Sequence, residues 1–193
     1  MRGWLLDTNV ISELRKSNCD TRVKTWSDNQ VPESMYLSRV TIAEIRYGIE
    51  RLPTADRMRK RLERWLTNEL RPWFAERLLD VDEDVFVVCR RLVERGKAMR
   101  HTFPQPDLFI AATAILHDLC VATRNAGDFV PTGVPVLNPW TDTHPRLAER
   151  AMWGWFAAAK SRMAAVLWLA PPSVASQEAV RRLCEVRQDH RFE

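Results

Sequence analysis

Short apolar runs alternate with longer amphipathic stretches along the first 140 residues of the chain. The first run, Gly3–Leu6, ends at Asp7 and is typical of a buried strand. The longer stretches repeat apolar residues three or four positions apart, as at Ile42, Ile45 and Ile49, which is helical spacing. Strands that alternate with helices in this way predict an α/β domain with a parallel sheet.

The predicted elements fill most of this region. The predicted strands are Gly3–Leu6, Met35–Ser38, Leu78–Val81, Cys120–Thr123 and Val134–Leu137. The predicted helices are Thr8–Arg15, Arg22–Asn29, Thr41–Arg51, a long charged pattern over Asp56–Leu79 interrupted near Pro72, Asp84–Arg100 and Asp107–His117, with a turn or helical turn over Asn125–Phe129.

The composition changes after Asn138-Pro139-Trp140. We therefore predict one domain over residues 1–140 and a helical C-terminal extension over residues 141–193. The extension has two helical patterns, about 148–169 and 175–189, separated by Pro171-Pro172. Its apolar residues could pack on the domain, extend an oligomer interface or touch a membrane surface, and packing against protein is the expectation.

Composition and charge narrow the class of protein. A chain of 193 residues with 46% hydrophobic and 28% charged residues is long enough to bury a core without disulfides. The four cysteines have no metal-ligand spacing and are interpreted as reduced thiols of a cytoplasmic protein. No transmembrane segment is expected, because Lys160 and Arg162 interrupt the only long apolar stretch. The net charge of +4 does not by itself identify a partner.

Four acidic residues occupy similar positions at the ends of predicted elements. Asp7 closes the first strand, Glu44 lies in the first turn of a helix, Asp107 opens a helix, and Asp128 follows the fourth strand. Ligands of open parallel sheets bind beyond the carboxyl ends of the strands. Clustered carboxylates repel one another unless a cation lies among them, and oxygen-only ligands favour Mg²⁺ or Mn²⁺. Such ions activate water for phosphodiester hydrolysis, which is the chemistry that this pattern predicts.

Each of the four acids also has a purely structural interpretation. Asp7 could cap the helix that follows it, and Asp107 could be an N-cap or a dipole partner of its own helix. Thr41 and Glu44 have the spacing of a capping box, and Asp128 could be an ordinary turn residue. The occurrence of all four at one edge of one predicted sheet favours the functional interpretation.

The acids lie in sequence stretches that follow one another in a characteristic order. These are Leu-Leu-Asp7-Thr-Asn9-Val-Ile-Ser-Glu, Thr-Ile-Ala-Glu44-Ile-Arg-Tyr-Gly, Pro-Asp107-Leu-Phe-Ile-Ala-Ala-Thr-Ala, Ala-Thr123-Arg-Asn125-Ala-Gly-Asp128-Phe and Asn-Pro-Trp140. Together they resemble the PIN-domain ribonucleases, and in particular the VapC/FitB toxins of bacterial type II toxin–antitoxin pairs. The resemblance covers residues 3–140 and implies a PIN-like, doubly wound parallel sheet and a Mg²⁺-dependent endoribonuclease.

The resemblance also implies a role for individual residues. Asp7 and Asp107 match the principal metal ligands, and Glu44 matches the acid that completes the site directly or through water. Family members carry an acid either at the position of Asn125 or at that of Asp128, and this chain is of the second kind. The expected cofactor is one or two Mg²⁺ ions, with Mn²⁺ as the alternative, and the expected products carry a 5′-phosphate and a 3′-hydroxyl. Residues expected to support the acids or contact RNA are Thr8, Asn9, Thr123, Arg124 and Asn125.

The expected partners follow from the same resemblance: an RNA substrate, a cognate antitoxin, a second copy in a homodimer, and DNA only through the antitoxin. In the family, the region matching Trp65, Trp73 and Phe74 helps form the dimer and receives the antitoxin's C-terminal segment. These aromatic residues could equally be core. The 141–193 extension departs from the family, whose chains usually end near Trp140.

Two clusters of basic residues are candidates for RNA binding. Each cluster could bind RNA phosphates, or it could be a solvent-exposed helix face on which basic residues alternate with glutamates. Arg124 is a better candidate, because it adjoins the acidic loop. The clusters are Arg57, Arg59, Lys60, Arg61 and Arg64 on one helix, and Arg90, Arg91, Arg95, Lys97 and Arg100 on another.

Other functions remain open at this point. The chain could be an antitoxin-binding module with little catalysis that acts in operon autoregulation, or a housekeeping PIN nuclease. A haloacid dehalogenase-type phosphatase would need a second Asp two residues after Asp7, where Asn9 stands. The histidines share no local motif, so metal-free His–His ribonuclease chemistry has no support from the sequence.

Overall fold

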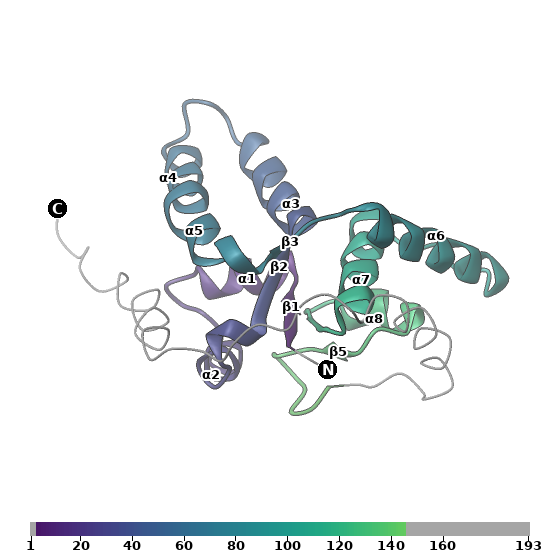
Figure 1. Cartoon of the computed structure of the whole chain (residues 1–193). Coiled ribbons are helices and arrows are strands. Elements are labelled where there is room, and N and C mark those ends of the chain that lie inside the picture. The colour runs from purple at the N-terminus through teal and green to yellow at the C-terminus, as the bar shows by residue number, and fades with distance from the viewer. Residues whose placement is uncertain (1–2, 146–193) are drawn as a thin grey trace.

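The computed structural model describes residues 3–145, and its strands form one parallel sheet in the order β3-β2-β1-β4-β5 (Figure 1). All four neighbouring strand pairs are parallel. The prediction of a parallel α/β sheet is confirmed. The strands predicted over Leu78–Val81 and Val134–Leu137 are each shorter than expected. The strands are β1 (Trp4–Leu6), β2 (Met35–Ser38), β3 (Leu78–Leu79), β4 (Cys120–Ala122) and β5 (Val136–Leu137).

The central strand β1 marks the point at which the strand order reverses. Its Trp4 is opposite both Met35 of β2 and Cys120 of β4, and the register with β4 continues to Leu6 and Ala122. The chain therefore winds outward through β2 and β3 on one side of β1, and through β4 and β5 on the other. In such sheets the crevice at the carboxyl ends of the two strands at the reversal is the usual ligand site.

Helices cover both faces of this sheet. They are α1 (Thr8–Leu14), α2 (Thr21–Asp28), α3 (Arg39–Glu50), α4 (Arg57–Trp65), α5 (Arg71–Trp73), α6 (Glu83–Ala98), α7 (Gln105–His117) and α8 (Ala126–Phe129). A π-helical turn, Leu66–Leu70, joins α4 to α5, and short 3₁₀ turns occupy Pro32–Ser34, Ala75–Arg77 and Val130–Thr132. The long helix predicted over Asp56–Leu79 therefore ends at Trp73, one residue after Pro72, and a 3₁₀ turn and β3 follow it.

Alternate residues of the central strands divide the core into two hydrophobic clusters. Leu5 and Val121 belong to the cluster that α6, α7 and α8 cover, whereas Leu6 and Ala122 belong to the cluster on the side of α1 to α4. This follows from the two-residue period of a strand, which sends successive side chains to opposite faces. Figure 1 shows α6, α7 and α8 on one side of the sheet and α3 and α4 on the other.

The aromatic residues, the cysteines and the helix lengths of residues 3–145 can be compared with the predictions from the sequence. Phe74 is only 1% exposed, so its interpretation as core is confirmed, while Trp65 and Trp73 are partly buried against the same cluster. The buried residues Cys89 and Cys120 are free thiols. None of the helices in this part of the chain is long and apolar enough to cross a membrane. The helices predicted near 148–169 and 175–189 lie outside the described residues.

Candidate active site

Asp7 stands directly after the central strand, where its backbone still belongs to the sheet. Its amide donates to the carbonyl of Ala122 at 3.0 Å, and its carboxylate Oδ1 accepts from the amide of Thr8 at 2.6 Å. Asp7 is therefore the N-cap of α1, as its structural interpretation predicted. Capping uses only one of the two carboxylate oxygens, so the other is available for contacts outside the helix.

The second oxygen of Asp7 is held by one side chain from the loop after β4 and one from α1. Oδ2 accepts from the Thr123 hydroxyl at 2.6 Å and from Asn9 Nδ2 at 2.7 Å. Burial raises the pKa of Asp7, the hydrogen bonds from Thr123, Thr8 and Asn9 oppose that rise, and the charge of Asp128 adds to it. Since a carboxylate oxygen accepts about two hydrogen bonds, Oδ2 is saturated and Oδ1 keeps one lone pair for a further ligand.

Glu44 lies in the second turn of α3 and not in the first, because the helix begins earlier than predicted. Ser38 is the N-cap, and its hydroxyl accepts from the amide of Val40 at 3.1 Å. The capping-box interpretation of Glu44 is therefore wrong: its Oε2 accepts from the Thr8 hydroxyl at 2.6 Å. Burial and the charge of Asp7 raise the pKa of Glu44. Thr8 thus fixes two acids, Asp7 through its amide and Glu44 through its hydroxyl.

Asp107 lies in the first turn of α7, and Asp128 lies in α8. Asp107 is not the N-cap of α7, since Pro104 holds that position. Its pKa is raised to about 6, first by burial and then by the charges of Asp7, Asp128 and Glu44. The structure therefore brings the four predicted acids into one electrostatic environment at the carboxyl ends of β1 and β4.

The four acids match a hard divalent cation in the chemistry of their donor atoms. Oxygen-only ligands suit Mg²⁺ or Mn²⁺, and a cation would relieve the repulsion that adds to the effect of burial on the pKa of Asp7, Glu44 and Asp107. Among residues 3–145, no three Asp, Glu, His or Cys side chains are arranged to hold one ion as they stand. Bringing carboxylates onto a shared ion thus requires side-chain rotation. Free acceptor capacity remains on Oδ1 of Asp7, and no described residue donates a hydrogen bond to the carboxylate of Asp107.

Asn9 connects the acids to the loop that follows β4. Its Nδ2 also reaches the Thr123 hydroxyl at 3.1 Å, and its Oδ1 accepts from the amide of Arg124 at 3.0 Å. The carbonyl of Arg124 accepts from Asn138 Nδ2 at 3.2 Å, and its guanidinium lies 5.4 Å from the ring centre of Trp140. The backbone of Arg124 is therefore held by Asn9 and Asn138, and its exposed guanidinium lies over Trp140, close enough to Glu13 of α1 to lower the pKa of that acid.

Asn138 and Trp140 were not predicted to be site residues. The Asn-Pro-Trp sequence served only as a matching stretch and a domain boundary. The available signal was an aromatic and an amide residue directly after the last strand, at the same edge of the sheet as the acids. Asn125 and Asp128 were both candidates for the fourth ligand, and the charge of Asp128 raises the pKa of Asp7 and of Asp107. Asn125 is exposed, and its backbone N–H donates a hydrogen bond to the Thr123 hydroxyl at 3.0 Å.

Comparisons with known proteins agree with this architecture. The PIN domain family model matches residues 4–130. Toxin FitB of Neisseria gonorrhoeae is 40% identical over 138 residues, which cover 72% of this chain and 99% of FitB. VapC ribonuclease Y4jK of Sinorhizobium fredii is 39% identical over 136 residues, covering 70% and 96% of the two chains.

The solved structures lead to the same fold. A structure of FitAB bound to the IR36 DNA fragment superimposes with a TM-score of 0.68 at 37% identity, covering 73% of this chain and 98% of that one. DNA-bound VapBC from Salmonella typhimurium has a TM-score of 0.59 at 20% identity and supports the fold alone. The matched relatives are covered almost completely, so the last quarter of this chain has no counterpart in them.

Proposed function

Since this chain belongs to the PIN domain family, we propose that it is a Mg²⁺-dependent endoribonuclease and the toxin of a toxin–antitoxin pair. The observation that carries the proposal is the environment of Asp107, whose pKa of about 6 reflects burial and the charges of Asp7, Asp128 and Glu44. Strongly perturbed pKa values cluster at functional sites, so this environment supports a functional role for Asp107. The identity to ribonuclease and toxin relatives supports RNA as the substrate.

In this proposal Asp7, Glu44, Asp107 and Asp128 hold the ion. When bound, Mg²⁺ supplies Lewis acidity at a phosphate oxygen and a hydroxide from water near neutral pH. The protein contributes orientation: three hydrogen bonds fix Asp7, and Thr8 fixes Glu44. Arg124 offers a cation to an RNA phosphate beside the acids. Cleavage at the 3′ oxygen leaves a 5′-phosphate and a 3′-hydroxyl.

An RNA cleavage assay with matched variants tests this function. End-labelled RNA is incubated with the full chain in Mg²⁺, in Mn²⁺ and in EDTA, and Asp7→Asn and Asp107→Asn are compared with Glu69→Gln, an exposed acid elsewhere. We expect metal-dependent cleavage by the parent chain and by Glu69→Gln, with a loss of at least about 100-fold in the two site variants. Undiminished cleavage by both site variants would contradict the assigned site.

The same proposal includes a cognate antitoxin that binds this chain and carries any DNA contact, and a homodimer of the toxin. Its support is the similarity to FitB in the FitAB structure and in the FitAcB structure from Neisseria gonorrhoeae, which has a TM-score of 0.67. Co-expression with the product of an adjacent small reading frame tests it. We expect a stable complex in which RNA cleavage is suppressed, whereas two proteins that purify separately would count against this partner.

A further inference from the structure

Helix α4 carries a row of cations along one side. Their spacing of three, four and seven residues from the first places all four on one face of an α-helix. All four are exposed. We call this row the α4 stripe; its members are Arg57, Lys60, Arg61 and Arg64.

The opposite side of α4 packs on the protein. Leu62 and Trp65 are partly buried against the hydrophobic cluster on that side of the sheet, and Leu66, which follows the helix, is 5% exposed. Because α4 is fixed through this apolar side, the α4 stripe faces solvent. Like charges three and four positions apart destabilise a helix, and cations near its N-terminus oppose the helix dipole. The stripe is therefore unfavourable for the helix on its own.

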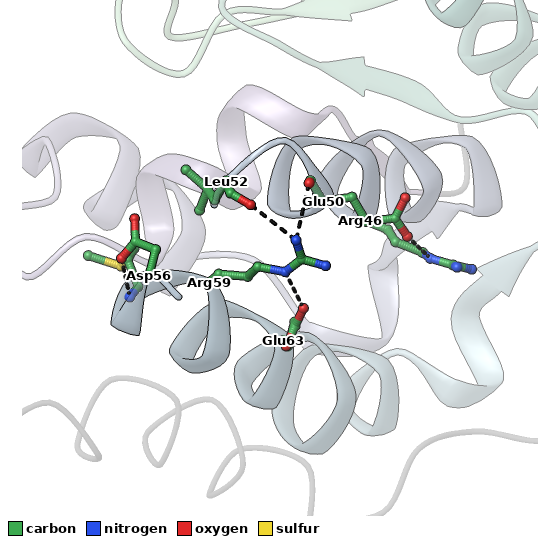
Figure 2. A network of polar contacts seen from close by, with 7 residues as sticks. Arg46, Glu50, Leu52, Asp56, Arg59 and Glu63 are labelled. Carbon is green, nitrogen blue, oxygen red and sulfur yellow. Dashed lines mark hydrogen bonds and ion pairs between the residues drawn. The ribbon is translucent and has the colours of Figure 1, made fainter. Parts of the chain in front are cut away.

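The only carboxylate within α4 already has another partner. Glu63 accepts from Arg59 Nε at 2.8 Å, and Arg59 Nη1 also donates to the carbonyls of Leu52 at 3.1 Å and Glu50 at 3.4 Å (Figure 2). Arg59 thus joins the start of α4 to the end of α3.

The acids around this junction are engaged as well, as Figure 2 shows. Glu50 pairs with Arg46 at 2.7 Å, and Asp56 accepts from the amide of Met58 at 2.7 Å as the N-cap of α4. Within residues 3–145, no carboxylate forms an ion pair with a member of the α4 stripe.

The second basic cluster of the sequence is different. On α6, Arg90 and Lys97 both pair with Glu94, at 3.5 Å and 3.0 Å. Arg95 donates to the carbonyl of Thr132 at 3.3 Å. The structure therefore separates two clusters that the sequence could not rank: the cations of α6 have partners within the fold, whereas those of the α4 stripe have no ion-pair partner in the described part of the chain.

We propose that the α4 stripe binds the phosphate backbone of the RNA strand, an inference that rests on the proposed ribonuclease function. Seven residues of α-helix rise about 10.5 Å, so the four cations form a row long enough to contact more than one phosphate of a strand. A polyanion of this spacing relieves the repulsion among all four cations at once. Helix α4 packs against α3, which carries Glu44, so a strand held by the stripe lies on the same helical pair as the catalytic acid (Figure 1).

The test uses charge-matched variants of the full chain. Arg57→Gln/Lys60→Gln and Arg61→Gln/Arg64→Gln each remove two cations of the α4 stripe, and Arg90→Gln/Lys97→Gln removes two paired cations of α6. All three are built with Asp107→Asn so that the RNA stays intact. Fluorescence anisotropy of a labelled RNA measures Kd between 50 and 200 mM salt, and circular dichroism checks the fold.

The two kinds of variant have different expected results. Each stripe variant should lower the slope of log Kd against log salt by about 1.5, since a phosphate contact contributes about 0.7–0.9. The control should change that slope by less than about 0.5. With Asp107 restored, removal of all four stripe cations should raise KM about tenfold or more while kcat stays within about twofold, because these cations bind substrate and transition state alike.

Three outcomes would overturn the inference, and they are distinguishable. If the parent chain cleaves RNA but the stripe variants match the α6 control, the stripe does not bind RNA and the proposed function stands. If the stripe variants keep RNA affinity and lose a co-expressed antitoxin, the stripe is a surface for an acidic protein. If neither the parent chain nor Asp107→Asn binds RNA and the parent does not cleave it, the proposed function fails together with the stripe.

Discussion

Replacing Asp107 by Asn is predicted to stabilise the metal-free protein while it abolishes cleavage. The pKa of Asp107 is raised from 3.8 to about 6 because burial and three neighbouring acids disfavour its charged form. Two pKa units correspond to about 3 kcal/mol, and solvent screening of this half-buried group reduces the figure to roughly 1–2 kcal/mol. For a domain of this size, that gain raises Tm by about 3–6 °C.

The sign of the effect gives it a characteristic pH dependence. Below pH 3.8 Asp107 is protonated whether the chain is folded or unfolded, so the substitution changes nothing. Between pH 3.8 and about 6 the folded chain retains a proton that the unfolded chain has lost, and stability falls as pH rises. The advantage of Asp107→Asn should therefore be small near pH 4 and complete above about pH 6.

Urea unfolding followed by circular dichroism in EDTA, at pH values from 4 to 8, measures this difference. Glu69→Gln serves as the control, since it removes an exposed acid outside the site. In Mg²⁺ the parent chain should recover stability by mass action and Asp107→Asn should recover less. A variant that is no more stable than the parent at pH 7.5, or equally more stable at pH 4 and pH 7.5, would refute the claim that burial and the neighbouring carboxylates disfavour the charged form of Asp107.

Three other predictions follow from the hydrogen bonds and charges of the site. Thr123→Val removes the donor to Asp7 Oδ2 and should lower the free energy of unfolding by about 1–3 kcal/mol; a urea midpoint equal to the parent's would contradict this. Asn9→Asp places a second carboxylate against Asp7, so its instability relative to Asn9→Ser should grow from pH 4 to pH 8 in urea titrations, and a pH-independent gap would exclude repulsion. Asp128→Asn should reduce RNA cleavage at least about tenfold and lower the pKa of Asp107 in an NMR titration, whereas Asn125→Ala should change neither. If Asn125→Ala has the larger effect on both, Asp128 is not the fourth ligand.

The elements of this fold could be predicted where the sequence pattern reflects burial directly. Cys120–Ala122 is buried on both faces of the sheet, so its strand shows as a continuous apolar run. The start of α3 was misplaced because Ser38 is both the last residue of β2 and the N-cap of the helix. The π-helical turn Leu66–Leu70 continues the helical spacing of α4, so periodicity could not reveal it.

The positions of the acids could be predicted, but their partners could not. Asp7 and Asp128 follow strands, and topology alone places them at one edge. The bond from Thr8 to Glu44 joins residues 36 apart in the chain, and nothing local distinguishes it from a capping box. The same holds for the basic helices: the bond from Arg59 to the carbonyl of Leu52 is a tertiary contact, and only the structure shows that the α4 stripe forms no ion pair within residues 3–145.

Anomalous diffraction from Mn²⁺-soaked crystals of the full chain tests whether the carboxylates of the site hold a divalent metal ion. We expect one or two anomalous peaks at the carboxyl ends of β1 and β4, bonded to oxygens of Asp7 and Asp107 at about 2.0–2.3 Å, and no such peak in Asp107→Asn. Saturating Mn²⁺ that leaves these carboxylates without a peak, or that binds only elsewhere, would contradict the assignment of a metal-dependent hydrolytic centre.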